Sequence, residues 1–412
     1  MTRFSRIIAT LAAGALVLAA CGEDAPVVDE PEELEELVEE PADEPEEEPA
    51  EEPEEEPAEE PEEEPVADGP WAGTGGDEDG VLRVAFVYVG PVGDAGWTYS
   101  HDQGRQALEE ALGDRVETTF LESVEEGAPA ERVFEDLARE GYHLIFGTSF
   151  GFMDSMAAVA PSFPDVVFDH ASGYTTLDNL GNYFGAMEEP RYLSGMAAAS
   201  MSETGQLGYV AAFPIPEVIR GINAFALGAQ EINPDATVEV VWTSTWFGPE
   251  IEQQAAETLL DRGADVIAQH QDTAAPGQAA EARGAYWVGY HSDQSQFAPD
   301  AWITAPVWDW SDHYIETAEQ VYDGSWEPRE VYATMADGMV GLAEFGPAVG
   351  DDIQALIEER GNQIMGGEFA PFTGPLLDQD GELVVEDGVE MTLGELLSMD
   401  WFVQGVVGSA GG

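Results

Sequence analysis

From residue 81 onward, short apolar runs rich in β-branched residues alternate with polar segments of helical length. Continuously apolar strands that alternate with helices are typical of parallel sheets covered on both faces, so we predict an α/β protein. The predicted strands are 81–89, 116–121, 143–148, 166–170, 207–213, 237–242, 265–270 and 285–290. The predicted helices are 101–112, 128–140, 189–203, 217–231, 249–262 and 311–323.

This pattern runs twice, over about 81–204 and again over 205–305, which predicts two doubly wound lobes joined by a hinge. We assign 81–204 plus about 306–328 to the N-terminal lobe and 205–305 plus about 329–412 to the C-terminal lobe. Hinge strands are expected near 203–206, 305–308 and 328–334. Open α/β sheets bind ligands outside the carboxyl ends of their strands, so we expect a cleft between the lobes.

The first 20 residues have the pattern of a secretory signal: Arg3 and Arg6 precede the apolar stretch 7–20, which is short for a membrane span. This stretch ends in "LAAC", and Cys21 is the only cysteine. The motif resembles the lipobox of bacterial lipoproteins, which implies cleavage before Cys21 and lipidation of its thiol. A chance cysteine beside an ordinary cleavage site is the alternative. The prediction is a protein held by lipid on the extracytoplasmic face of the cell membrane.

Residues 21–80 form an acidic segment, with 29 acidic and no basic residues over 23–80 and proline at every fourth position from 41 to 65. Such a segment cannot bury enough apolar area to offset its ordering entropy, and its charges repel one another. We therefore predict a disordered, extended stalk. A partner for the acidic run is the less favoured alternative.

The part of the chain after residue 80 is also acidic, with 55 acidic and 11 basic residues. Nucleic acid is therefore excluded as a partner on electrostatic grounds. All 13 basic residues are arginine. Excess carboxylate without lysine indicates adaptation to high salt, where screening weakens the repulsion between charges.

The segments after the predicted strands are rich in aromatic, amide and imidazole side chains. The glycine turn "GPVGDAGW" ends in a tryptophan, at a position where a large ring is hard to bury. Convergence of these segments would form a site for a planar, polar heterocycle, with rings to stack on and polar groups to contact its edge. The candidate ligand-binding residues are Asp94, Trp97, Phe150, Phe152, Asp169, His170, Ile215, Trp246, Gln269, Asp272, His291, Asp293 and Asp309.

Catalytic and metal sites are less well supported by the sequence. "QHQD" and "HSD" offer pairs of metal ligands, but a zinc or iron site needs a third ligand. The glycine turn after the first strand lacks the spacing of a dinucleotide loop, and "SFGF" is not a nucleophile elbow. We predict no cofactor, no metal and no catalysis. The alternatives are an enzyme that processes nucleosides or bases and a ligand sensor for a membrane signalling receptor.

Several long segments resemble the basic membrane protein family, among them "VAFVYVGPVGDAGWTYSHDQGRQALE", "LIFGTSFGFMD", "GYVAAFPIPEVIRGINAFALGAQEINP" and "FAPFTGPLLDQDG". The resemblance implies a lipid-anchored substrate-binding protein of an ABC importer, with a type I periplasmic-binding-protein fold and a membrane permease as partner. It also implies a purine nucleoside or base as ligand, stacked on Trp97 with Phe150 as a second wall. "AGWTY" after Asp94 and "QHQD" at 269–272 depart from nucleoside binders and favour a free, adenine-like base.

We expect the folded part to require molar salt for full stability, because screening reduces the repulsion among its carboxylates. The measurement is the melting temperature between 0.1 and 2 M salt, which should rise. A melting temperature that stays constant or falls would reject this adaptation.

Overall fold

The computed structural model describes residues 80–411. The predicted signal, Cys21 and the acidic segment up to residue 79 lie outside the described residues. Among the helices of the described part, none combines the length and the apolarity needed to cross a bilayer.

The first lobe is built on a six-stranded sheet in which all neighbouring strands are parallel. Its order is β12 (Glu330–Ala333), β5 (Leu180–Gly185), β4 (Val167–Ala171), β3 (Leu144–Thr148), β1 (Leu82–Tyr88) and β2 (Val116–Leu121). Helices α1 (Trp97–Leu112) and α8 (Ser311–Asp323) cover one face, and α2 (Ala128–Arg139) and α3 (Met153–Val159) cover the other. Alternate residues of β1 enter the two cores, with Phe86 on the α8 side and Val87 on the α2 side.

The second lobe repeats this plan with a second six-stranded parallel sheet. Its order is β10 (Trp302–Thr304), β9 (Tyr286–Val288), β8 (Val266–His270), β6 (Gln206–Ala211), β7 (Thr237–Trp242) and β16 (Val406–Val407). Helices α4 (Glu188–Met201) and α5 (Pro216–Ile232) cover one face, and α6 (Pro249–Asp261) and α7 (Ala275–Ala282) cover the other. The predicted α/β fold with two parallel-sheet lobes is confirmed.

The C-terminal part of the chain extends the second lobe. It contains α9 (Asp351–Met365), the strand pair β14 (Leu376–Leu377) and β15 (Leu383–Val385), and α10 (Leu393–Leu397). Ile357 and Phe372 from this part are buried in the same core as α4 and α5.

Two elements lie in a different lobe from the one that the sequence suggested. Helix α4 packs on α5 in the second lobe, because Gly195 and Gly228 let the two backbones approach closely. Strand β12 pairs with β5 in the first sheet, where Val331 and Tyr332 pack against the first lobe's core. The N-terminal lobe therefore ends near residue 185 rather than 204, and 330–333 return to it.

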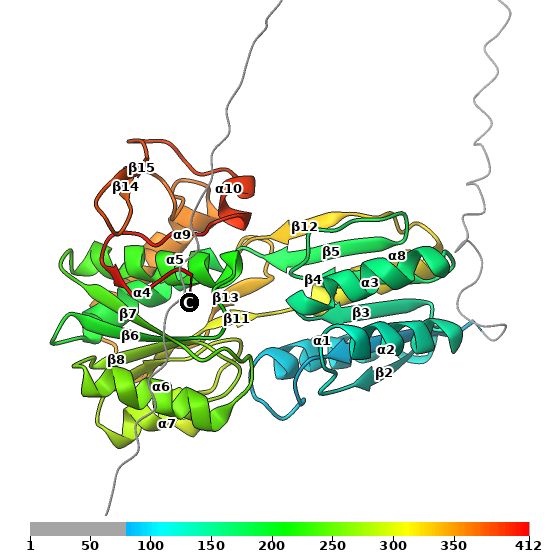
Figure 1. Ribbon diagram of the computed structural model, residues 1–412, viewed down its shortest axis with the longest axis horizontal. Coiled ribbons are helices and arrows are strands. Elements are labelled where there is room, and N and C mark those ends of the chain that lie inside the picture. The colour runs from blue at the N-terminus through cyan, green and yellow to red at the C-terminus, as the bar shows by residue number, and fades with distance from the viewer. Residues whose placement is uncertain (1–79, 412) are drawn as a thin grey trace, which may run out of the picture. The chain divides into compact units, whose positions relative to one another are not determined.

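Three segments connect the lobes. One is the short link between β5 and α4, and the other two contain β11 (Pro306–Trp308) and β13 (Val340–Leu342). β11 and β13 pair antiparallel and lie between the two lobes (Figure 1). Of the three expected hinge segments, 305–308 coincides with β11, whereas the other two crossings lie at about 185–188 and 334–342.

Because α4 and α5 are in close contact, we predict that a single methyl group added between them lowers the stability of the protein. A Cβ on Gly195 would overlap the carbonyl oxygen of Phe225, so we expect Gly195→Ala to lower the free energy of unfolding by about 1–3 kcal/mol, as overpacked cores do. Chemical denaturation measures it. Gly394→Ala in α10 is the matched control, since no atom lies within 4 Å of its new Cβ. Equal stability of the two variants would contradict the predicted overlap.

Candidate ligand-binding site

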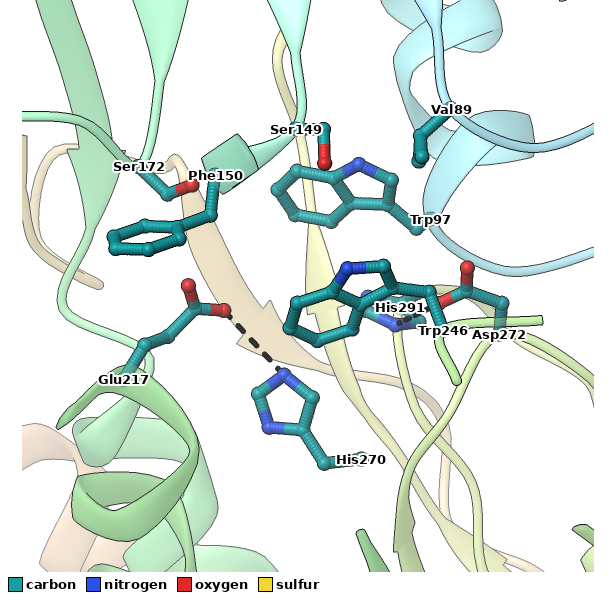
Figure 2. Close-up of a pocket in the computed structure, with 10 residues that line it drawn as sticks. All are labelled: Val89, Trp97, Ser149, Phe150, Ser172, Glu217, Trp246, His270, Asp272 and His291. Atoms are coloured by element: carbon teal, nitrogen blue, oxygen red, sulfur yellow. Dashed lines mark ion pairs between the residues drawn. The ribbon is translucent and has the colours of Figure 1, made fainter. Parts of the chain in front are cut away.

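A small cavity lies between the lobes, at the carboxyl ends of both sheets. In the first lobe, the lining residues follow strands β1, β3 and β4. In the second lobe, they lie at the end of β8, in the segments after β7 and β9, and on α5. The lining residues are Val89, Trp97, Ser149, Phe150, Ser172, Glu217, Trp246, His270, Asp272 and His291 (Figure 2).

Trp97 is the first residue of α1, and its indole is fixed from several sides. The indole Nε1 donates to the carbonyl oxygen of Thr148 at 2.7 Å. The rings of His101, Trp308 and Trp310 meet it at 82–83°. Only 8 % of the residue is exposed, and it contributes to the cavity wall. The side chain is therefore held in place in the described structure by the protein itself.

The glycine turn before Trp97 brings the two lobes together. Ala95 has a φ of +60°, and its carbonyl oxygen accepts hydrogen bonds from Ser292 Oγ and from Gln294 Nε2 of the second lobe. A Cβ on Gly96 would overlap the carbonyl oxygen of Asp272. Glycine is needed here because the turn touches the opposite lobe.

The aromatic walls come from both lobes. Trp97 and Phe150 follow strands of the first lobe, and Trp246 follows β7 of the second. Figure 2 shows the indoles of Trp97 and Trp246 one above the other, with the ring of Phe150 to one side. Trp246 is supported from behind by Phe213, whose ring centroid is 4.9 Å away. The arrangement offers flat apolar surfaces on opposite sides of the cavity.

One polar pair in the cavity joins α5 to the end of β8. Glu217 Oε1 lies 3.4 Å from His270 Nε2 (Figure 2). Burial lowers the pKa of His270 to about 4, against a smaller opposite effect of Glu217. The imidazole is therefore neutral near pH 7, and its Nε2 side faces the carboxylate.

A second polar pair is formed by Asp272 and His291, with 3.3 Å between Asp272 Oδ1 and His291 Nε2. Trp308 Nε1 donates to His291 Nδ1 at 3.0 Å, so the proton of the neutral ring is on Nε2. Burial raises the pKa of Asp272, and the nearby carboxylates of Asp94 and Glu252 raise it further. Burial also lowers the pKa of His291. The pair therefore favours the neutral form of both groups.

The structure brings five of the candidate residues to the cavity: Trp97, Phe150, Trp246, Asp272 and His291. Asp94 instead organises the start of α1, where its carboxylate accepts three backbone N–H groups. This role is structural.

Three other polar candidates are buried away from the cavity lining. Asp169 Oδ2 lies 2.9 Å from His313 Nε2, and His170 Nε2 lies 2.7 Å from a backbone carbonyl oxygen. Gln269 accepts from Trp287 Nε1 and donates to two backbone carbonyl groups. Because their hydrogen bonds are made within the lobes, these residues position strands and loops.

The remaining four candidates also lie outside the cavity lining. Phe152 is fully buried in the first lobe, edge-to-face with Phe134. Ile215 precedes α5 and packs against the second lobe's core. Asp293 and Asp309 are exposed, and each accepts the backbone N–H two residues on, as aspartates in turns commonly do.

Sequence reasoning missed Val89, Ser149, Ser172, Glu217 and His270. Some signal existed for the last of these, because His270 stands inside "QHQD" between two chosen residues. Glu217 follows the proline at the start of α5 and resembles an ordinary residue of a first helical turn. Within residues 80–411, no group of three or more His, Cys, Asp or Glu side chains is placed to hold a metal ion.

Residues 81–370 match the Bmp family, described as ABC transporter substrate-binding protein, PnrA-like. The chain belongs to this family. A purine-binding protein of Brucella abortus is 48% identical to it over 325 residues, which are 79% of this chain and 93% of that protein. A putative ABC transporter glucose-binding protein of Haloferax volcanii, TsgA13, is 41% identical over 338 residues, 82% of this chain and 83% of that protein.

Solved structures share the fold. An ABC transporter solute-binding protein of Aeropyrum pernix superposes with a TM-score of 0.63 at 20% identity, covering 70% of this chain and 92% of that one. One of Conexibacter woesei gives 0.59 at 22% identity, covering 70% and 98%. The protein is thus an ABC transporter substrate-binding protein with a type I periplasmic-binding-protein fold, a class that acts outside the cytoplasm.

The raised pKa of Asp272 predicts a pH-dependent effect of Asp272→Asn. A carboxyl group whose pKa is higher in the folded than in the unfolded protein stabilises fully below its unfolded pKa and loses that contribution as the pH rises. The asparagine variant should therefore gain stability relative to the wild type from about pH 4 upward, by at most about 1.4 kcal/mol per pH unit. Thermal melts of the ligand-free proteins between pH 4 and 9 measure this. A stability difference that stays constant with pH would show that the carboxyl group is not held protonated.

Proposed function

We propose that the protein captures a free purine base, adenine-like, in the interlobe cavity and hands it unaltered to an ABC permease in the membrane. The observation that carries this proposal is the presence of two indoles, Trp97 and Trp246, on the walls that the two lobes contribute to one cavity. The purine-binding name of the Brucella relative supports it.

Stacking explains why such walls suit a base. A purine is flat and presents a π-face on both sides, and stacking one base on an aromatic side chain contributes about 1–3 kcal/mol. Because Trp97 belongs to one lobe and Trp246 to the other, a ligand between them would favour the closed arrangement over an open one. Differential affinity of this kind is what drives domain closure in binding proteins.

The polar lining suits the edge of a base. An adenine edge carries an amino group and ring nitrogens, which require both acceptors and donors. Glu217 supplies an acceptor, and Ser149 and Ser172 supply hydroxyl groups. Protonated Asp272 could donate as well as accept. A set that can both donate and accept suits an uncharged ligand with both kinds of group on its edge.

A second cavity bears on the choice between a free base and a nucleoside. It shares Phe150, Ser172 and Glu217 with the first and continues between the lobes to Arg220 and Tyr332. A free base needs only the space between the rings, and we favour it because the segments "AGWTY" and "QHQD" depart from nucleoside binders. A sugar attached to the base would extend into the second cavity.

Glucose is the competing ligand, because the Haloferax relative is named a putative glucose-binding protein. A hexose exposes hydroxyl groups around its whole rim and would need a polar partner for most of them. A saturated sugar ring has no π-face to stack on Trp97 and Trp246, and the relative named for purine binding is the more similar of the two, at 48% against 41% identity. We therefore rank the sugar second.

The lipid anchor belongs to the same proposal. Acylation of Cys21 would hold the protein at the outer membrane surface, and the acidic segment would act as the tether. Confinement to the surface raises the effective concentration of the protein near the permease without any new contact. The proposed cycle breaks no bond, so formation of free base or inosine from adenosine would instead indicate an enzyme.

Removal of one wall tests the binding mode. We expect Trp246→Ala to weaken adenine binding by roughly five- to a hundredfold, because losing one stacking partner costs about 1–3 kcal/mol and about 1.4 kcal/mol is a factor of ten. Trp97→Ala should act in the same direction. Isothermal titration calorimetry with adenine, adenosine and glucose measures it, after native mass spectrometry has identified any ligand retained through purification.

Trp242→Ala is the matched control, since Trp242 lies four residues before Trp246 but stacks on Phe402 outside the cavity lining. It should bind adenine like the wild type. Wild-type affinity of both cavity variants would reject the stacking role, and binding of glucose alone would reject the purine.

A further inference from the structure

Arg191 is a fully buried cation with few partners. It lies near the start of α4 with none of its surface exposed, and its Nη1 donates to the carbonyl oxygen of Gln269 at 2.7 Å. Its guanidinium stands 3.5 Å above the ring centroid of Tyr290. Among the described residues, no carboxylate forms an ion pair with it, and its Nε and Nη2 make no hydrogen bond of normal geometry, although the guanidinium also interacts with the buried Tyr290 hydroxyl and opposes the rise of its pKa. A buried donor left without an acceptor is costly, so these N–H groups require one.

A second buried nitrogen without a partner lies close by. His270 Nδ1 makes no hydrogen bond with the described residues, while its Nε2 faces Glu217 in the cavity. Both atoms are buried in the second lobe and make no hydrogen bond to one another.

The space between these groups is opened by a glycine. A Cβ built on Gly221, in α5, would lie 3.6 Å from Arg191 Nε and 3.8 Å from His270 Nδ1, and apart from the neighbouring backbone of α5 no atom would be nearer to it. The missing side chain thus leaves a small polar space that both nitrogens border. Gly221 also follows Glu217 by one helical turn, which places this space directly behind the Glu217–His270 pair.

We propose that a buried water molecule occupies the space beside Gly221, accepts from Arg191 Nε and donates to His270 Nδ1. A small polar site with convergent buried partners is where proteins retain internal water. By occupying the lone pair of Nδ1, the water fixes the imidazole as its Nε2–H tautomer, which presents a donor to Glu217. Arg191 is then a positioning residue for the cavity, although it does not line it.

The charges around His270 agree with this tautomer. Glu217 of α5 faces its Nε2, Tyr290 and His291 after β9 pack against its ring, and Arg191 and Arg220 contribute positive charge. Burial and the two arginines oppose protonation, so the ring is neutral and has one nitrogen free to accept. Arg191 can donate only, hence an intervening water satisfies both groups.

Gly221→Ala is a sharp test because the new methyl group fits without a clash yet fills the proposed water site. Long-range ¹H–¹⁵N spectra of the ligand-free full chain report the tautomer of each of the 6 histidines, with His270→Gln used to assign the signal. We expect the wild-type His270 to be protonated on Nε2, with Nδ1 at the chemical shift of a hydrogen-bonded acceptor. In Gly221→Ala, the Nδ1 signal should move to the position of an unbonded nitrogen or the Nδ1–H tautomer should appear.

The folded state should survive this change. Alanine has a higher helix propensity than glycine, which offsets part of the cost of leaving the two nitrogens without the water, so Gly221→Ala should still unfold in one cooperative transition. Gly394→Ala, another helical glycine with open surroundings, should leave the His270 signal unchanged. Arg191→Met, which removes the donor, should shift the same signal as Gly221→Ala does.

Three results would overturn the proposal. One is a His270 spectrum in Gly221→Ala identical to that of the wild type. Another is a wild-type His270 protonated on Nδ1. The third is an anomalous peak beside Arg191 in bromide-soaked crystals, which would make the occupant a halide. The measurement uses the ligand-free protein, so its result does not depend on the proposed purine binding.

Discussion

The carboxylate of Asp94 fixes the turn on which the binding site depends. It accepts three backbone N–H groups at the start of α1, and the turn that results sends the carbonyl group of Ala95 to the second lobe and the indole of Trp97 to the cavity. Burial raises the pKa of this carboxyl group above its ordinary value, and the three hydrogen bonds offset only part of that rise. One short loop therefore begins a helix, joins the two lobes and places an aromatic wall.

The fold could be predicted from the sequence because strand and helix periodicity is local. The run 116–121 became β2 over the same residues, and 311–323 became α8. Lobe membership could not be predicted in this way, because it depends on long-range pairing. Strand β12 is short and partly exposed, and only its contact with β5 shows that it belongs to the first sheet.

Site residues could be predicted from the sequence where a large aromatic side chain follows a strand. Trp97 and Trp246 follow strands of the two sheets, at the edge where open α/β sheets bind ligands, and large rings at that edge are natural candidates for the walls of a site. Polar candidates were less predictable, because an aspartate such as Asp169 serves equally well as a partner for His313 inside a lobe. Glu217 lines the cavity because the first turn of α5 points toward it, and no sequence pattern predicts the direction of a helix in the fold.

The antiparallel pair of β11 and β13 limits how the lobes can move. Two strands hydrogen-bonded to one another slide past each other only by breaking their ladder, whereas they can bend together. The lobes should then swing about one axis, and the separation between the two indoles becomes a function of a single angle. Under the proposed binding mode, a ligand of one aromatic layer would let that angle close further than a thicker ligand would, so the angle between the lobes would report the thickness of the ligand to the permease.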